Sequence, residues 1–255
     1  MLTNIFESHA HYYNNRFDDD RDQLLTSLHA NGLRYVMNIG ADLESSAAVV
    51  ALADRYDFCY ATVGVHPTDT SGLPGDYLEQ LARLAAHPKV RAIGEIGLDY
   101  FHDPEGAATQ PAFFAQQLEL ARDLDLPVVI HDRDAHGDTM DMLARYRPRG
   151  VVHCYSGSAE MAQELVKLGF YIGFTGVVTF KNARRALEAA AVVPADRLLV
   201  ETDCPYMAPE PYRGQRCHSG MLVQVLEKLA ELRGVSAQSL ADQTCRNAQT
   251  LFNIT

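Results

Sequence analysis

Seven side chains of the types that bind metals or move protons stand at the ends of short apolar runs. They are His9, His11, His66, Glu95, His131, His153 and Asp203. The His9-Ala10-His11 spacing points two imidazoles to the same side of an extended backbone. Buried polar groups cost several kcal/mol each when they stay unpaired, and divalent cations would pair with these. The residue types and their spacing therefore predict a metal centre.

The size of this group indicates two cations, because one tetrahedral catalytic ion uses three protein ligands and an open position. We expect one cation on His9, His11 and Asp203, a second on His131 and His153, and Glu95 as the bridge. Two such cations, about 3.5–4 Å apart, can use a metal-bridging hydroxide and stabilise both oxygens of an in-line displacement at phosphorus. The residue types suit Zn²⁺ and Mn²⁺, whereas Mg²⁺ prefers more oxygen ligands, and they leave the element open among these three. Two dications and two carboxylates leave roughly +2 at the centre, which favours an anionic substrate.

The elements that must position these residues form a repeating pattern of strands and helices. Apolar runs predict strands over residues 2–8, 33–39, 59–65, 90–95, 127–130, 150–153, 171–174 and 197–201. Amphipathic stretches predict helices over residues 20–31, 43–56, 76–86, 110–124, 136–146, 159–168 and 182–193. Eight such units in ~250 residues are typical of a (β/α)₈ TIM barrel, whose strand ends converge on one face. A doubly wound open sheet is the alternative, but no strand is followed by a Gly-rich phosphate-binding loop.

Four of the five histidines outside the strand ends are interpreted as structural, because they fall in predicted helices or loops. They are His29, His87, His102 and His136. No linker or low-complexity segment divides the chain, so residues 1–255 are predicted to form a single domain, with the last ~35 residues as closing helices.

Composition excludes several classes of protein. With 47% hydrophobic and 22% charged residues, the 255-residue chain is not of disordered or fibrous type. A net charge of −11 disfavours sequence-independent binding to long stretches of phosphate backbone. Five cysteines without a C-x-x-C pair indicate neither a disulfide framework nor a zinc ribbon. Neither a signal peptide nor an apolar run of ~18 residues is present, so we expect a cytoplasmic protein with no membrane partner and no obligate protein partner.

Six segments around these residues resemble the TatD-type deoxyribonuclease family in order and spacing. They read FESHAHY at 6–12, GVHP at 64–67, IGEIGLDY at 93–100, IHDRDA at 130–135, HCYSGS at 153–158 and ETDCPY at 201–206. The resemblance covers essentially the whole chain. It implies a metal-dependent hydrolase on an amidohydrolase-like barrel, with deoxyribonuclease activity on DNA ends or single strands.

The resemblance also implies roles for individual residues. It assigns as metal ligands the same six residues that the spacing selects: His9, His11, Glu95, His131, His153 and Asp203. It places His66 at a substrate phosphate, and Asp203 would also accept a proton from the attacking water. Glu201 lies two residues before Asp203 on the same face of the strand, so it is either a residue that orients a ligand or water, or a paired carboxylate of the barrel interior. Phosphate contacts would come from Arg133, Lys181, Arg213 and Arg216, each of which fits a solvated surface charge equally well. Tyr12, Tyr100, Tyr155 and Tyr206 stand in the same loops and could stack on a base, but packing beneath the loop is the favoured interpretation of any single one.

Two segments depart from the pattern of that family. Glu7 stands where many members have Asp, and Arg216-Cys217-His218-Ser219 replaces an Arg-Asn-Glu-Pro run. The second change lies in the loop after the last strand, so it could alter substrate preference and bring His218 near the site. The substrate we expect is DNA, as a strand end or a short oligonucleotide.

Two alternative functions stay open. An amidohydrolase-type enzyme acting on a cyclic amide, lactone or other small ester shares the barrel and the H-x-H pair. Members of that class with a carboxylated lysine need Lys at the fourth strand, where this chain has Glu95. A structural metal site on a binding module would instead hold metal tightly without hydrolysis.

Overall fold

Eight parallel strands form one sheet that curves into a nearly closed barrel. In the computed structural model, which describes residues 1–255, the strands follow the chain order from β1 to β8. They are β1 Ile5–Ala10, β2 Leu33–Ile39, β3 Cys59–Val63, β4 Val90–Asp99, β5 Val128–Arg133, β6 Gly150–Val152, β7 Tyr171–Phe174 and β8 Leu198–Val200. The fold is the predicted (β/α)₈ TIM barrel.

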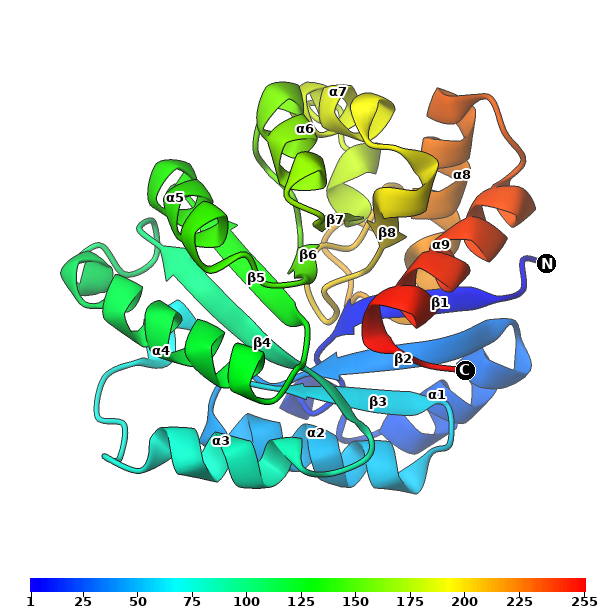
Figure 1. Ribbon diagram of the computed structural model, residues 1–255. Helices are drawn as coiled ribbons and strands as arrows, with labels where there is room; N and C mark the ends of the chain where they lie inside the picture. The colour runs from blue at the N-terminus through cyan, green and yellow to red at the C-terminus, as the bar shows by residue number, and fades with distance from the viewer.

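Helices follow the strands and cover the outside of the barrel, as Figure 1 shows. They are α1 Arg21–Ala30, α2 Leu43–Arg55, α3 Tyr77–Ala85, α4 Gln110–Asp123, α5 His136–Tyr146, α6 Ala159–Lys167, α7 Arg184–Val192, α8 Leu222–Arg233 and α9 Ala237–Phe252. Their buried faces and the outer faces of the strands form a core cluster of 52 buried residues. The predicted closing helices are α8 and α9, and no helix is long and apolar enough to cross a membrane.

The barrel closes between β1 and β8 through a short contact instead of a full ladder. Ala10 and Cys204 form one parallel bridge, the amide of His11 donates to the carbonyl of Cys204 (2.8 Å), and that of Asp203 donates to His9 (2.9 Å). This contact sets the H-x-H pair directly beside Asp203.

Helix α9 closes the opposite end of the barrel. Its residues Cys245, Ala248 and Phe252 join a second core cluster with side chains such as Phe6 and Leu199 from the barrel interior. Asn247 donates from Nδ2 to the carbonyls of Ala195 and Leu198, at 2.8 Å each, and so fixes α9 at the start of β8.

Three strands that carry cluster residues run past their predicted ends. β1 continues from the expected Ser8 to Ala10 and β5 from the expected Ile130 to Arg133, so His9 and His131 lie inside their strands. We expected β4 to end at Glu95, but it continues to Asp99, and its pairing with β5 shifts register between Ile93 and Ile96. Glu95 therefore lies inside the strand, at this irregularity. A Cβ on Gly97 would lie 2.0 Å from the carbonyl oxygen of His131, so glycine there lets the extended β4 approach β5.

Candidate metal centre

Six side chains converge at the mouth of the barrel, where the carboxyl ends of the strands meet. This mouth cluster consists of His9, His11, Glu95, His131, His153 and Asp203. His9 is fully buried, and the Glu95 side chain is only 5% exposed. The structure thus brings together all six residues that the sequence selected as candidate ligands.

Glu95 lies between two sets of histidines and presents a different oxygen to each. Its Oε1 lies 2.8 Å from Nδ1 of His131 and 2.7 Å from Nε2 of His153. Its Oε2 lies 3.3 Å from Nε2 of His9 and 3.9 Å from Nε2 of His11. This is the arrangement of a carboxylate that bridges two positions.

On the β1 and β8 side, two imidazoles and a carboxylate converge on one point. The Nε2 atoms of His9 and His11 lie 3.2 Å apart, and Oδ1 of Asp203 lies 3.2 Å from His11 and 3.7 Å from His9. Atoms that share a cation at ~2.0–2.2 Å are separated by roughly 3–3.5 Å. The spacing and the nitrogen–oxygen donor set therefore fit a divalent cation.

The electrostatics of the cluster are those of imidazoles gathered around carboxylates. Burial alone would raise the pKa of Glu95, but His153, His9 and His131 hold that pKa well below its ordinary value. Burial would likewise lower the pKa of His153, yet Glu95 and Glu201 raise it well above its usual range. Glu95 is thus held in the charged form that also binds cations.

Glu201 lies behind His153, inside the barrel. It is fully buried, and its Oε1 accepts the amide of Cys154 at 2.5 Å and lies 3.6 Å from Nδ1 of His153. A Cβ on Gly173 would come within 2.5 Å of Oε2, so the glycine of β7 makes room for this carboxylate. Two roles were predicted for Glu201, and its contacts are compatible with both. It is a paired carboxylate of the barrel interior, and it lies beside His153 of the cluster.

Glu7, which replaces the usual Asp, is buried beneath the cluster. It accepts hydrogen bonds from the amide (2.8 Å) and the hydroxyl (2.6 Å) of Thr202 and from the amide of His9 (3.3 Å). Burial raises its pKa to about 8. Glu7 thereby joins the backbone of β1 to the segment that carries Asp203.

Sequence reasoning gave no role to Asp99, which contacts both His131 of the cluster and His102. Asp99 is buried, and its Oδ2 lies 2.9 Å from Nε2 of His131 and 2.8 Å from Nδ1 of His102. A carboxylate on the outer nitrogen of a histidine fixes the orientation of its ring. The missed signal is the spacing of Glu95 and Asp99, four residues apart along one strand and facing the same histidine.

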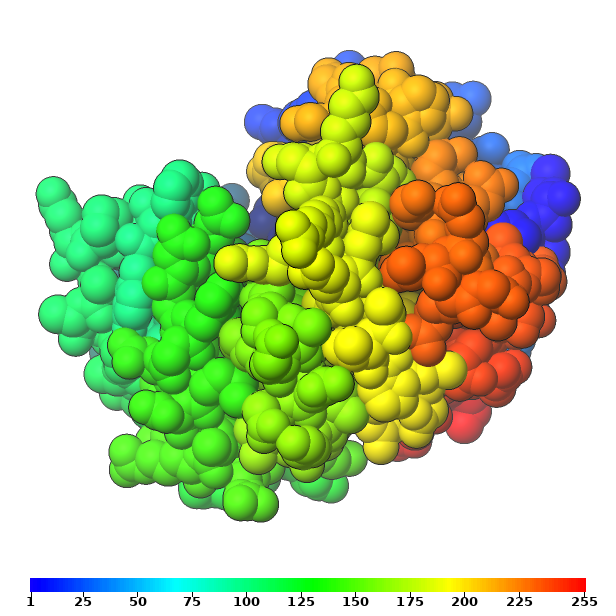
Figure 2. Space-filling view, turned by 90° about the horizontal axis from the view of Figure 1, so that it is seen from above, coloured from blue at the N-terminus to red at the C-terminus, as the bar shows by residue number.

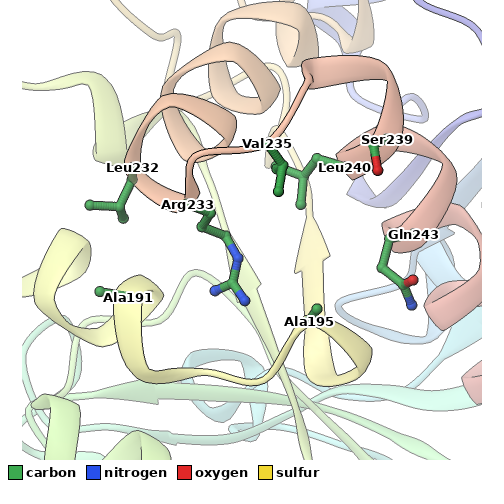
Figure 3. Close-up of a pocket in the computed structure, with 8 residues that line it drawn as sticks. All are labelled: Ala191, Ala195, Leu232, Arg233, Val235, Ser239, Leu240 and Gln243. Carbon is green, nitrogen blue, oxygen red and sulfur yellow. The ribbon is translucent and has the colours of Figure 1, made fainter.

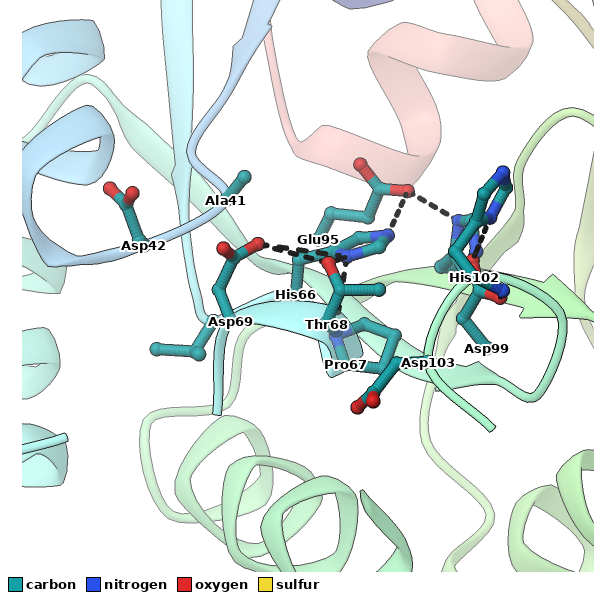
Figure 4. Close-up of polar contacts among 12 residues, drawn as sticks. Ala41, Asp42, His66, Pro67, Thr68, Asp69, Glu95, Asp99, His102 and Asp103 are labelled. Atoms are coloured by element: carbon teal, nitrogen blue, oxygen red, sulfur yellow. Dashed lines mark hydrogen bonds and ion pairs between the residues drawn. The ribbon is translucent and has the colours of Figure 1, made fainter. Parts of the chain in front are cut away.

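His66 faces the cluster from the loop after β3, as Figure 4 shows. Its Nε2 lies 3.7 Å from Oε1 of Glu95, and its Nδ1 contacts the hydroxyl of Thr68 at 2.7 Å. Burial lowers the pKa of His66 to about 3, so the ring is neutral at physiological pH. The structure places it beside the cluster, as expected.

A cavity of about 420 Å³, the mouth cavity, opens beside the cluster. Its wall includes three cluster residues, His131, His153 and Asp203, together with Arg133 and Arg185. The loops after β7 and β8 contact each other, because the amide of Glu210 donates to the hydroxyl of Thr179 (2.8 Å), and Figure 2 shows these segments as neighbours in yellow-green and orange.

The other predicted substrate contacts have different surroundings. Lys181 is exposed in the loop after β7, and the Arg213 guanidinium lies 4.2 Å from the centre of the Phe180 ring. Arg216 instead forms a two-pronged ion pair with Asp20, at 2.7 and 2.6 Å, which leaves it engaged with the protein. His218 caps the short helix Ser219–Met221 through the amide of Gly220 and has no contact with the cluster.

The four tyrosines considered for base stacking also differ in exposure and in distance from the cluster. Tyr12 is fully buried and bonds to Ser219, and the hydroxyl of Tyr155 donates to the carbonyl of Ser158. Tyr100 donates to Asp138. Tyr206, at 50% exposure and with its ring centre 6.4 Å from that of His11, is the one that is both open and adjacent to the cluster.

A second cavity, also of about 420 Å³, lies between α7, α8 and α9 (Figure 3). Its wall is mostly apolar, and its one charged residue, Arg233, donates to the carbonyls of Ala190 and Val193. No cluster of titratable groups faces it, so volume alone does not mark a site of chemistry here.

Comparison with known proteins agrees with this geometry. The family model described as "TatD related DNase" matches residues 6–253. The chain is 38% identical to "Uncharacterized metal-dependent hydrolase YabD" of Bacillus subtilis, covering 98% of this chain and 99% of that one. It is also 38% identical to "3'-5' ssDNA/RNA exonuclease TatD" of Cronobacter sakazakii, covering 97% of each.

Comparison with solved structures also indicates the TatD family. The crystal structure of YJJV, a TatD homolog from Escherichia coli K12, superposes with a TM-score of 0.93 at 34% identity, over all of both chains. A TatD family hydrolase from Entamoeba histolytica, at 23% identity and a TM-score of 0.87, shares the fold. The chain belongs to the TatD related DNase family and is a hydrolytic enzyme.

Proposed function

We propose that the protein is a metal-dependent nuclease that removes nucleotides from the ends of single-stranded DNA, and of RNA, by hydrolysing phosphodiester bonds. The observation that carries this proposal is the position of Glu95, whose two oxygens face two separate sets of histidines. The exonuclease name of a relative that is 38% identical supports the choice of substrate.

The mouth cluster would hold two divalent cations, Mg²⁺, Mn²⁺ or Zn²⁺. His9, His11 and Asp203 would hold one, His131 and His153 the other, and Glu95 would bridge them. When bound, the pair supplies Lewis-acid activation of water and stabilises charge on the attacking and leaving oxygens. The two oxygens of Glu95 and the 3.2 Å separation of the Nε2 atoms of His9 and His11 support this division.

The chain's own residues would do the remaining work. The carboxylate of Asp203, whose side chain is 15% exposed, would accept a proton from the attacking water. Glu201 would keep the His153 ring oriented, and Asp99 would do the same for His131. The neutral His66 and the cation of Arg133 would contact the substrate phosphate, with Lys181 and Arg213 contributing charge from the neighbouring loops.

The test is whether metal-loaded protein hydrolyses a single-stranded oligonucleotide, a phosphodiester reporter, or a panel of cyclic amides and lactones. A 5′-labelled single-stranded oligonucleotide and a phosphodiester reporter should both be cleaved with Mg²⁺, Mn²⁺ or Zn²⁺, and the oligonucleotide should yield a ladder. Asp203→Asn should lower turnover at least ~10²-fold, the usual contribution of a proton-transfer group. Hydrolysis of only a cyclic amide or lactone panel, with no phosphodiester cleaved under any metal, would refute the nuclease assignment.

A further inference from the structure

Two exposed aromatic side chains stand on opposite sides of the mouth cluster. Tyr206 follows Asp203 of the cluster in the loop after β8, and Phe101 lies in the loop after β4. The strands follow the order from β1 to β8 and the barrel closes between β1 and β8, so β4 and β8 lie across the barrel from each other. A substrate held at the cluster therefore has one aromatic ring on each side of it.

Phe101 is 55% exposed, but the backbone that carries it is fixed. Its amide and that of His102 both donate to Oδ1 of the buried Asp99, at 3.0 and 2.7 Å. The ring meets that of His102 at 87°, with the two centres 4.8 Å apart. An exposed ring on an ordered backbone loses little conformational freedom when a partner binds to it, which favours binding.

Arg133 connects Phe101 to the mouth cavity. Its guanidinium carbon lies 4.7 Å from the centre of the Phe101 ring, and both Arg133 and His102 line the cavity. Nε of Arg133 is buried and has no hydrogen-bond partner. A guanidinium that lies over an aromatic ring can bind a phosphate through its other N–H groups. A phosphate on Arg133 would therefore bring the base of the same nucleotide within reach of Phe101.

Tyr206 is held in a comparable way on the other side of the cluster. Its amide donates to the carbonyl of Asp203 at 2.9 Å, and its hydroxyl accepts a hydrogen bond from Nδ2 of Asn14 at 3.3 Å. Its ring is as open to solvent as that of Phe101 and lies beside His11. Both rings are thus accessible and ordered before a strand binds.

We propose that Phe101 and Tyr206 form a base clamp, in which each ring stacks on one of two consecutive bases and the phosphodiester between those bases lies at the cluster. This inference rests on the proposed nuclease function. Stacking on an aromatic side chain is tolerant of sequence, because every base has a π-face. In a duplex the bases are paired and already stacked on each other. The base clamp therefore selects unpaired strands and not particular bases.

The experiment combines substrates that lack one base with variants that lack one ring. Oligonucleotides with an abasic site at the last or the second-last nucleotide are compared with the intact strand. On the intact strand, Phe101→Ala and Tyr206→Ala should each lower kcat/KM about tenfold, as expected for one stacked base. Each loss should shrink below about twofold when the base that the ring contacts is already absent, so the two variants should respond to different abasic positions.

Conservative and distant substitutions provide the controls. Phe101→Tyr keeps an aromatic ring and should recover most of the loss, whereas Phe101→Leu keeps only apolar surface and should resemble Phe101→Ala. Leu124→Ala is the matched control, because it removes an exposed apolar side chain just before β5, at the barrel end opposite the mouth. It should leave kcat/KM unchanged on every strand. If the losses in Phe101→Ala and Tyr206→Ala are the same with and without each base, the base clamp is wrong.

The preference for single strands gives a second readout that a merely structural role of Phe101 would not change. In Phe101→Ala, the ratio of kcat/KM for a single strand to that for a blunt duplex should fall about tenfold, because only the single strand presents an unpaired base to the ring. General damage to the mouth would lower both rates equally. An unchanged ratio would contradict the base clamp.

A binding measurement separates this inference from the nuclease assignment. If the wild type cleaves no oligonucleotide, the proposed function fails, and the base clamp is tested with a short single strand that carries 2-aminopurine at either of its last two positions. Stacking quenches the fluorescence of this base. The dissociation constant should rise about tenfold in Phe101→Ala and in Tyr206→Ala and stay unchanged in Leu124→Ala. Equal affinity of the wild type and Phe101→Ala, or no binding by the wild type, would overturn the base clamp.

Discussion

Glu95 is the side chain on which both halves of the mouth cluster depend. It contacts His131 and His153 through one oxygen and His9 through the other. Glu95→Ala should therefore lose metal as well as activity. Metal content, measured by elemental analysis, should fall below two per chain, and turnover should fall more than ~100-fold, since even partners of a metal ligand contribute ~10–100-fold.

Arg133→Ala is the matched control for Glu95, because Arg133 lines the mouth cavity but provides no donor to the cluster. This variant should keep its metal and raise KM for the oligonucleotide. Two cations retained in Glu95→Ala would contradict the bridging role.

At the scale of single residues, type and spacing predicted the six members of the cluster, because strand ends of a parallel barrel meet on one face. They did not predict the contact of Asp99 and His102, since a loop after the strand brings that imidazole back onto the carboxylate. They also did not show that Arg216 is paired with Asp20, a residue 196 positions earlier. Partners so distant along the chain leave no local pattern in the sequence.

At the scale of elements, α9 closes the barrel end that lies opposite the mouth. Phe252 is 1% exposed, and its ring stacks at 6.1 Å on that of Phe6 in β1. Phe252→Ala should lower the free energy of unfolding by about 3–5 kcal/mol, as for other buried aromatic side chains, measured by denaturant titration. Metal content per folded chain should stay unchanged because the mouth is at the other end.

Leu232→Ala, at the exposed end of α8, is the control for that truncation. Its effect should stay within about 0.5 kcal/mol, the range of surface substitutions. Comparable losses in both variants would contradict the closing role of α9.

Most helices and strands were predictable, because each has a clear hydrophobic periodicity and ends at residues that interrupt it. Residues 136–146 and 171–174 were predicted with the bounds that α5 and β7 have. The extension of β4 to Asp99 was not predicted, because glycines at 94 and 97 resemble a strand end in sequence. In the structure these glycines permit close packing on β5, where a Cβ on Gly94 would lie 2.6 Å from Val129.

At the scale of the whole molecule, a net charge of −11 surrounds a mouth whose wall carries Arg133 and Arg185. Such a protein can bind only the few phosphates near the mouth, because the acidic surface elsewhere repels the nucleic-acid strand. Each phosphate contact to a single strand contributes about −0.7 to the slope of log affinity against log salt concentration. We expect about three contacts, and so a slope of roughly −2 for kcat/KM under subsaturating substrate.

The same charge distribution predicts how the rate depends on strand length. Cleavage should reach its full kcat/KM with a short single strand and gain little from further nucleotides, because nothing outside the mouth attracts them. Oligonucleotides of increasing length, assayed at several salt concentrations, measure both quantities. A slope much steeper than about −2, with kcat/KM rising steadily with length, would reveal an extended basic track and contradict binding confined to the mouth.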